Sequence, residues 1–152
     1  MSTAGLDTYV TTAMMMDPDE GEFHLLIADD SSAFRETLRE FLQRRTQLVI
    51  HEVCSGEDAL DYVQECRIDI VLLDMHMHRM TGLETLRMLK DLNTLRPCIL
   101  ITSDDSSDLR RDATEADAHA VLCKPMNRLE LVTTLSSALH DAYDLPLSDD
   151  FG

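Results

Sequence analysis

The chain has 152 residues, a length that suits one domain with a substantial apolar core. Its 29 acidic residues outnumber its 13 basic residues, which gives a formal net charge of −16. Binding to nucleic-acid phosphates requires clustered Lys and Arg, so this charge disfavours direct nucleic-acid binding. No apolar run approaches the roughly 20 residues that cross a bilayer, so we also expect no membrane segment.

The acidic excess gathers at the two ends of the chain. Residues 1–22 hold five acidic residues and no basic one, and residues 141–152 hold four acidic residues and no basic one. Segments of this kind are usually solvated, because they bury too little apolar surface to fold. We therefore expect a flexible acidic N-terminal extension over 1–22, one domain over 23–141 and an acidic C-terminal tail over 142–152.

The four cysteines are widely spaced and include no C-x-x-C pair. This spacing indicates neither a zinc cluster nor a redox motif. We expect buried, reduced thiols in a cytoplasmic protein.

The first half of the domain predicts two strand-helix units. His24–Ala28 is an apolar strand, and a helix over Ser32–Arg45 follows, because its apolar residues recur at helical spacing. Leu48–Val53 is the second predicted strand. Ser55 then offers an N-cap for the next helix, with Asp58 three residues later as its capping partner.

The second half predicts three more strand-helix units. The expected strands are Ile68–Leu73, Cys98–Thr102 and Ala120–Cys123. The first of these is almost continuously apolar, which is typical of a central parallel strand covered on both faces. The expected helices are Thr81–Asn93, Ser107–Ala116 and one that starts near Asn127 with Glu130 as capping partner. The helix over 107–116 has the thinnest apolar face, so we expect it to pack least firmly.

Five strand-helix units predict an α/β fold, a flavodoxin-like, doubly wound (βα)5 three-layer sandwich. The expected parallel five-stranded sheet has the order 2-1-3-4-5. This order places the second strand at an edge of the sheet. The residues that follow that strand, Cys54-Ser55-Gly56, include no candidate site residue, which supports the order.

Polar residues stand at the carboxyl ends of the four other strands: Asp29 and Asp30, Asp74, Thr102 and Lys124. In a parallel sheet these ends meet in one crevice. Three carboxylates there repel one another and need a cation, and an all-oxygen site suits Mg²⁺. Asp74 is then a candidate nucleophile toward a phosphoryl group, whose other oxygens Lys124 and Thr102 can bind. Taken singly, the Asp pair is also typical of a helix N-cap, the Thr of a structural residue and the Lys of a solvated charge.

With these motifs the chain resembles the receiver domains of bacterial two-component response regulators. The resemblance covers about residues 23–141. It rests on Ile27-Ala28-Asp29-Asp30-Ser31, Val71-Leu72-Leu73-Asp74-Met75-His76-Met77, Met80-Thr81-Gly82, Thr102-Ser103 and Lys124-Pro125. It implies that Asp74 is the phosphoacceptor and that Asp29, Asp30, Asp74 and the backbone carbonyl of His76 hold Mg²⁺. It also implies that Thr102 and Lys124 bind the phosphoryl oxygens and that Lys124-Pro125 is a cis peptide.

The chain departs from the family pattern at three positions. His78 stands four residues after Asp74, where Pro is common, so this loop loses a fixed φ. Val121 stands at the switch position, where an aromatic residue is usual, and Asp117 stands where Gly is common. Because a valine cannot swing as a Tyr or Phe does, we expect any signal to rely more on the loop after Thr102 and the helix that follows.

Two further residues, His76 and Asp104, each lie two positions after a site residue. We hypothesise that both border the phosphoryl group and tune how fast water hydrolyses it. The alternation of His and Met over residues 76–80 also leaves open a soft-metal site, for example for copper. The alternative is that Met77 packs inward while His76 and His78 flank the phosphoryl site.

Only residues 142–152 follow the last expected helix, which is too short for an output domain, so together with the resemblance we expect a stand-alone signalling module that is not an enzyme. It would take a phosphoryl group on Asp74 from a sensor histidine kinase or a histidine phosphotransfer protein. It would then signal to a downstream protein through the face formed by helix 107–116, strand 120–123 and the last helix, and a homodimer stays open. One alternative is a pseudo-receiver that docks constitutively without phosphorylation, which His78 and Val121 favour. The other is an Asp-nucleophile phosphatase or phosphotransferase, which is disfavoured because no acid lies two residues after Asp74.

Overall fold

The structure of the chain, a computed structural model, describes residues 22–45, 47–92 and 96–143. The rest of the expected extension and of the expected tail lies outside these residues. One parallel sheet has the strand order β2-β1-β3-β4-β5, which confirms the predicted topology. Its strands are β1 (Phe23–Ala28), β2 (Leu48–Val53), β3 (Ile70–Asp74), β4 (Cys98–Thr102) and β5 (Ala120–Cys123).

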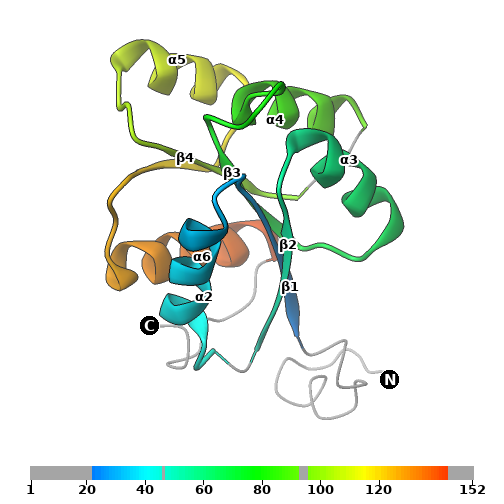
Figure 1. The fold of residues 1–152 in the computed structure, drawn as a ribbon, viewed down its shortest axis with the longest axis vertical. Helices are drawn as coiled ribbons and strands as arrows, with labels where there is room; N and C mark the ends of the chain where they lie inside the picture. Colours follow the sequence, from blue (N-terminus) through cyan, green and yellow to red (C-terminus); the bar gives the residue numbers. More distant parts are fainter. Residues whose placement is uncertain (1–21, 46, 93–95, 144–152) are drawn as a thin grey trace.

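Helices cover both faces of the sheet (Figure 1). On one face lie α2 (Ser32–Leu42) and α6 (Arg128–Tyr143). On the other face lie α3 (Gly56–Glu65), α4 (Gly82–Asp91) and α5 (Ser107–Glu115). The fold is therefore the predicted three-layer sandwich. None of the helices in the described part of the chain has the length and apolar character of a membrane span.

Alternate residues of the strands enter two apolar cores. In β1, Leu25 and Ile27 belong to the core beneath α2 and α6, whereas Leu26 and Ala28 belong to the core beneath α3 and α4. All residues of β3 are buried, as expected of a central strand covered on both faces. Because each fully buried Leu or Ile contributes about 1.5–3 kcal/mol of transfer free energy, these cores fix the strands firmly against one another.

The strand register brings the carboxyl ends of the strands to one edge of the sheet. Ala28 pairs with Leu73, Asp74 pairs with Ile101, and Thr102 pairs with Cys123. Residues at or just after these positions therefore converge in space, although they lie far apart in the chain.

The predicted helix caps are present. Asn127 and Glu130 cap the start of α6 reciprocally, because the Glu130 N–H donates to Asn127 Oδ1 at 2.8 Å and the Asn127 N–H donates to Glu130 Oε1 at 3.1 Å. Ser55 Oγ accepts the N–H of Asp58 at 3.1 Å, which confirms the N-cap of α3. The prediction that α5 packs least firmly also holds, since Ala113 is the one residue of this helix that is buried.

Three helix ends differ from the prediction. The helix α4 ends at Asp91 rather than Asn93, which lies outside the described residues. The helix α2 ends at Leu42 rather than Arg45, because the Arg45 N–H donates to the Leu42 carbonyl at 2.9 Å and closes a tighter turn. The helix α6 continues past Asp141 to Tyr143, whose hydroxyl donates to the Asp69 carbonyl at 2.5 Å. The Tyr143 ring also lies 6.0 Å from that of Phe23, so a tertiary contact extends the helix.

Two further expectations are corrected. The strand β3 begins at Ile70 rather than Ile68 and includes Asp74; the carbonyl of Ile68 instead accepts the Arg96 Nε–H at 2.6 Å. Cys54 is exposed, whereas we expected buried thiols, because it lies at the end of an edge strand. Cys98, inside β4, is buried as expected.

Candidate functional site

The sheet edge brings the three predicted acids together. Asp29 and Asp74 are buried, at 1% and 4% exposure, and Asp30 is exposed. Each of the three offers a carboxylate oxygen, and these oxygens all lie within 4.8 Å of one another. The Asp29 Oδ1 atom also accepts the Ser31 N–H at 2.8 Å, which fixes the orientation of its carboxylate. The acids therefore form one cluster, called the acidic pocket below, in which Asp30 is the exposed member.

Lys124 reaches this acidic pocket from the end of β5. Its Nζ lies 3.3 Å from Asp29 Oδ2 and 3.3 Å from Asp74 Oδ1. The Lys124 N–H donates to the Thr102 carbonyl at 2.7 Å, and the Lys124-Pro125 peptide is cis, as the resemblance implied. The ammonium thus neutralises part of the negative charge that the three carboxylates concentrate.

The electrostatics of the pocket disfavour a charge on Asp74. Burial, and after it the charge of Asp29, raises the pKa of the Asp74 carboxyl group above its usual value. Lys124 and a hydrogen bond from the His76 backbone oppose this shift without cancelling it. A cation added to the pocket would therefore stabilise the ionised, nucleophilic form of Asp74.

The donor set suits a small hard cation. Mg²⁺ binds oxygen ligands at about 2.0–2.1 Å in an octahedron, so the oxygens of opposite ligands are about 4 Å apart. The spread of up to 4.8 Å between the carboxylate oxygens matches a shared ion of this size with little adjustment. Asp29, Asp30 and Asp74 could therefore hold Mg²⁺, with room for other oxygen ligands on the exposed side.

Thr102 is fully buried at the end of β4, and its hydroxyl faces the loop that follows. The hydroxyl accepts the Asp104 N–H at 3.0 Å and lies 3.5 Å from His76 Nε2. His76 and Asp104 are both exposed. The two residues predicted to tune hydrolysis therefore flank the hydroxyl of the residue predicted to bind the phosphoryl group.

Gly82 holds the loop between β3 and α4 against the site. Its N–H donates to the Met75 carbonyl at 3.0 Å. A Cβ atom at position 82 would lie 2.5 Å from the backbone oxygen of Asp74, so a larger residue at this position would displace the end of β3.

In the His-Met segment of this loop, the methionine side chain at position 77 is buried and the neighbouring histidine side chains are exposed to solvent. Met77 is buried, at 7% exposure, whereas His76 and His78 are exposed. This division favours the flanking role of the histidines over a His–Met metal site. Arg79 adopts a left-handed backbone with φ of 72°, which is uncommon for a residue other than Gly, Asn or Asp.

The departures from the family pattern have clear local structures. Val121 is half-buried, pairs with Leu100 in register and packs against the core beneath α3 and α4. Asp117, where Gly is common, has a left-handed φ of 67°. Val121 is β-branched, so its χ1 rotamers are restricted, and its side chain packs against this core.

Two residues of α2 complete the pocket and were not predicted. The Lys124 Nζ lies 4.0 Å from the centroid of the Phe34 ring, a cation–π contact. The Arg35 guanidinium donates to the Asp29 carbonyl and, at 2.9 Å, to Glu52 Oε1. The spacing of Phe34 in its helix marks it as a core residue, and nothing in the local sequence indicates a contact with so distant a lysine.

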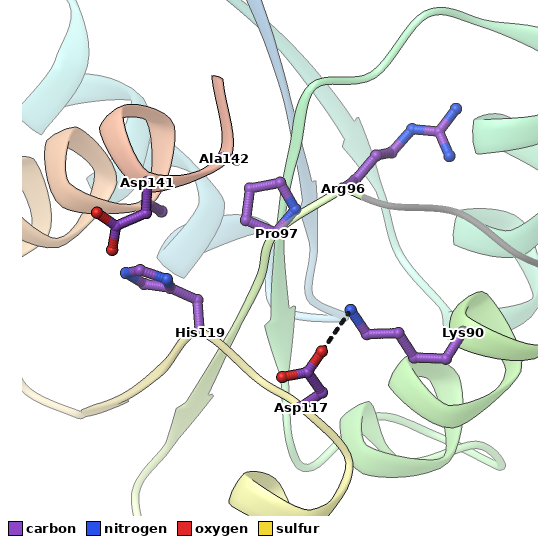
Figure 2. A pocket seen from close by; sticks show the side chains of 8 residues that line it. Lys90, Arg96, Pro97, Asp117, His119, Asp141 and Ala142 are labelled. Carbon is purple, nitrogen blue, oxygen red and sulfur yellow. Dashed lines mark ion pairs between the residues drawn. The ribbon is translucent and has the colours of Figure 1, made fainter. Parts of the chain in front are cut away.

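A second hollow lies at the opposite edge of the sheet, where β4 and β5 begin (Figure 2). It has a volume of about 350 Å³ and a lining of mixed charge. In it, Lys90 Nζ lies 3.8 Å from an Asp117 carboxylate oxygen, and Arg96 points away to hold the Ile68 carbonyl (Figure 2). These groups neutralise one another or support the backbone, so the acidic pocket is the better candidate for phosphoryl chemistry.

Comparisons with known proteins identify the family of the chain. A family model described as the response regulator receiver domain matches residues 25–136. The transcriptional regulatory protein ZraR of Salmonella typhimurium is 34% identical over 119 residues, which cover 78% of this chain and 27% of ZraR. The response regulator MprA of Mycolicibacterium vanbaalenii is 34% identical over 115 residues, which cover 76% of this chain and 49% of MprA. The chain therefore spans from about a quarter to about half of the length of these relatives.

Solved structures match over most of their own length. The chemotaxis protein CheY4 of Vibrio cholerae has a TM-score of 0.72 and 26% identity, and the match covers 78% of this chain and 99% of that one. A CheY-like receiver domain protein of Methanospirillum hungatei has a TM-score of 0.75 and 20% identity, and the match covers 81% of this chain and 98% of that one. At this identity the likeness supports the fold alone. With the family model matching most of the chain, this protein belongs to the response regulator receiver domains, which are phosphoacceptor signalling modules.

Proposed function

We propose that Asp74 is the residue of this receiver domain that accepts the phosphoryl group. Its carboxylate is buried at the end of β3, beside Asp29 and 3.3 Å from the Lys124 ammonium, and this position carries the proposal. An oxygen of Asp74 attacks phosphorus, and an O–P bond forms. The bond between phosphorus and the donor atom breaks, and its electron pair leaves with the donor.

The neighbouring groups balance the charge of this transfer. Asp29, Asp30, Asp74 and the backbone carbonyl of His76 would hold Mg²⁺, which supplies charge neutralisation at the phosphoryl oxygens. The Lys124 ammonium would move from the carboxylates to a phosphoryl oxygen, a short shift because it already lies 3.3 Å from Asp74 Oδ1. Attack by Asp74 needs its ionised form, which the cation and Lys124 both favour.

Phosphorylation would change the loop between β4 and α5. The new group adds roughly −1.5 to −2 charges and several acceptor oxygens. To donate to one of them, the Thr102 hydroxyl has to turn from its contacts with Asp104 and His76, which draws the loop inward. The loosely packed α5 then shifts with little loss of buried area, because Ala113 is its one buried residue.

The partners follow from this direction of signalling. A sensor histidine kinase or a histidine phosphotransfer protein would supply the phosphoryl group in the cytoplasm. A downstream protein would read the face formed by α5, β5 and α6, and His76 and Asp104 would set the lifetime of the phosphorylated state. In this proposal the chain signals by protein binding and does not turn over a substrate.

Incubation with Mg²⁺ and acetyl phosphate, followed by intact mass measurement, tests the proposal. We expect the mass of one phosphoryl group on the wild type and none on Asp74→Ala. A wild type that gains no mass would support a pseudo-receiver that docks without phosphorylation. Repeated hydrolysis of a phosphomonoester would support a phosphatase that uses Asp74 as nucleophile. Mass gain without added Mg²⁺ would contradict the role of the acidic pocket in holding the cation.

A further inference from the structure

The Lys124 ammonium has three neighbours in the acidic pocket, and one of them is an aromatic ring. Its Nζ lies 3.3 Å from Asp29 Oδ2, 3.3 Å from Asp74 Oδ1 and 4.0 Å from the centroid of the Phe34 ring. A lysine ammonium has three N–H donors, so two carboxylates and one ring face can take all of them. The face of the ring attracts a cation through its quadrupole and carries no net charge. A metal ion or a phosphoryl group therefore cannot neutralise this neighbour as it can neutralise the carboxylates.

Ser31 fixes the start of α2, and with it Phe34, relative to the acidic pocket. The Ser31 N–H donates to Asp29 Oδ1 at 2.8 Å, and its hydroxyl oxygen accepts the Phe34 N–H at 3.2 Å as the N-cap of α2. The Phe34 side chain also packs against the core beneath α2 and α6. Lys124, by contrast, has a flexible four-carbon stem, and its side chain is 24% exposed. Of the two contacting side chains, the lysine is therefore the one that can leave.

A cation in the acidic pocket would weaken the hold of the carboxylates on Lys124. Mg²⁺ would bind the same oxygens and repel the ammonium. A lysine held by the carboxylates alone would then turn toward the solvent, and it would have to return before it could neutralise a phosphoryl oxygen. The attraction between the ring and the ammonium opposes this departure, because it persists when the carboxylates are neutralised.

We propose that Phe34 is a positioning residue that keeps the Lys124 ammonium at the acidic pocket while Mg²⁺ is bound. This role rests on the proposed function, in which Lys124 moves to a phosphoryl oxygen as Asp74 attacks phosphorus. The ring acts on two quantities in opposite directions. It lowers the affinity for Mg²⁺, because it retains a positive charge beside the cation. It raises the rate of phosphoryl transfer, because the ammonium is already in place.

Fluorinated phenylalanines at position 34 test this role. Mono-, di- and trifluorophenylalanine, incorporated by amber suppression, weaken the negative ring face stepwise with little change of shape. Along this series, the rate constant for phosphorylation by acetyl phosphate at saturating Mg²⁺ should fall by about 2- to 10-fold in total, the range that a cation–π contact supports. The affinity for Mg²⁺, measured by calorimetry, should rise over the same series.

The same fluorinated series at position 41 is the matched control. Phe41 lies on the same helix and packs against the same core as Phe34. Fluorination there perturbs the packing of a ring without changing a contact with Lys124, so both the rate constant and the Mg²⁺ affinity should stay constant.

NMR tests the contact itself, without Mg²⁺ and without phosphoryl transfer. Lys90 and Lys124 are the two lysines of the chain, so a sample labelled with ¹³C-lysine gives two sets of side-chain signals, which Lys90→Met assigns. In Phe34→Leu, the protons on Cε of Lys124 should move downfield, because they lose the shielding of the ring face. The corresponding signals of Lys90 should not move.

The results that would overturn the proposal are specific to the ring. They are an unchanged Lys124 signal in Phe34→Leu, a rate constant that does not vary with fluorination at position 34, and equal effects of the series at position 41. A rate constant and a Mg²⁺ affinity that fall together would also overturn it, because damage to packing lowers both. A wild type that accepts no phosphoryl group would refute the proposed function, whereas the NMR and calorimetry results would still decide whether the ring holds Lys124.

Discussion

Substitution of Lys124 by Met should destabilise the protein in the absence of Mg²⁺. The Lys124 Nζ lies 3.3 Å from carboxylate oxygens of both Asp29 and Asp74. At this separation and an effective dielectric constant of about 20, each pair attracts by about 5 kcal/mol before desolvation is counted. Breaking a buried pair by removing one partner costs about 3–5 kcal/mol. Because the Lys124 side chain is 24% exposed, we expect a loss of about 2–3 kcal/mol.

Urea unfolding with a chelator and with saturating Mg²⁺ measures this loss. The difference in unfolding free energy between Lys124→Met and the wild type should become smaller with Mg²⁺, because the cation replaces the missing ammonium among the carboxylates. Binding of an ion at 100 times its Kd stabilises a folded protein by about 2.7 kcal/mol, so the recovery is measurable. The double variant with Asp74→Asn should also recover part of the loss, because it removes one of the uncompensated charges.

Lys90→Met is the matched control. Lys90 pairs with Asp117 at 3.8 Å, and the Asp117 side chain is 91% exposed, so this ion pair contributes about 0–1 kcal/mol. The electrostatic account of the pocket is refuted if Lys124→Met loses no more stability than Lys90→Met in the chelator. It is also refuted if Mg²⁺ does not change the difference in unfolding free energy between Lys124→Met and the wild type.

Four further outcomes follow from the structure. Asp74→Asn should raise the urea midpoint without Mg²⁺ at pH 7. The pKa of Asp74 is raised in the folded protein, so the group favours folding while it is protonated, and this stabilisation is lost as the pH rises through that pKa. An unchanged or lower urea midpoint for Asp74→Asn would contradict this reasoning. Burial lowers the pKa of His51 below 6.5, so the free energy of unfolding of the wild type should fall as the pH drops below 6.5. His51→Gln should flatten this dependence of stability on pH, and parallel curves for the variant and the wild type would contradict the role of His51. Arg79→Asn should stabilise the protein by about 0.5–1 kcal/mol in urea unfolding, because Asn tolerates the left-handed φ of 72°, and a loss of stability would be inconsistent with strain there. His76→Asn and Asp104→Ala should alter the lifetime of the phosphorylated state, and unchanged lifetimes in both would remove their tuning role.

The sequence was sufficient for the part of the site that the sheet itself assembles. Asp29, Asp74 and Lys124 each stand at the end of a recognisable strand, and parallel topology alone brings such ends together. The sheet order was predictable for the same reason, since one strand end carried no candidate residue.

Contacts between elements distant in the chain were not predictable. The extension of α6 to Tyr143 depends on Asp69 and Phe23, and no local signal marks either partner. The packing of Phe34 against Lys124 depends on how α2 lies across the sheet. The short end of α2 depends on a tight turn at Arg45 that helical periodicity over 32–45 does not reveal.

The central claim is that Asp74 carries the phosphoryl group, and chemical trapping locates that group most directly. Borohydride reduces an aspartyl phosphate to homoserine, so peptide mapping after treatment with acetyl phosphate and Mg²⁺ reports the modified position. We predict homoserine at position 74 and nowhere else in the chain, and none when acetyl phosphate is omitted. Homoserine at Asp29 or Asp30, or a wild-type protein with no homoserine at position 74, would contradict the account.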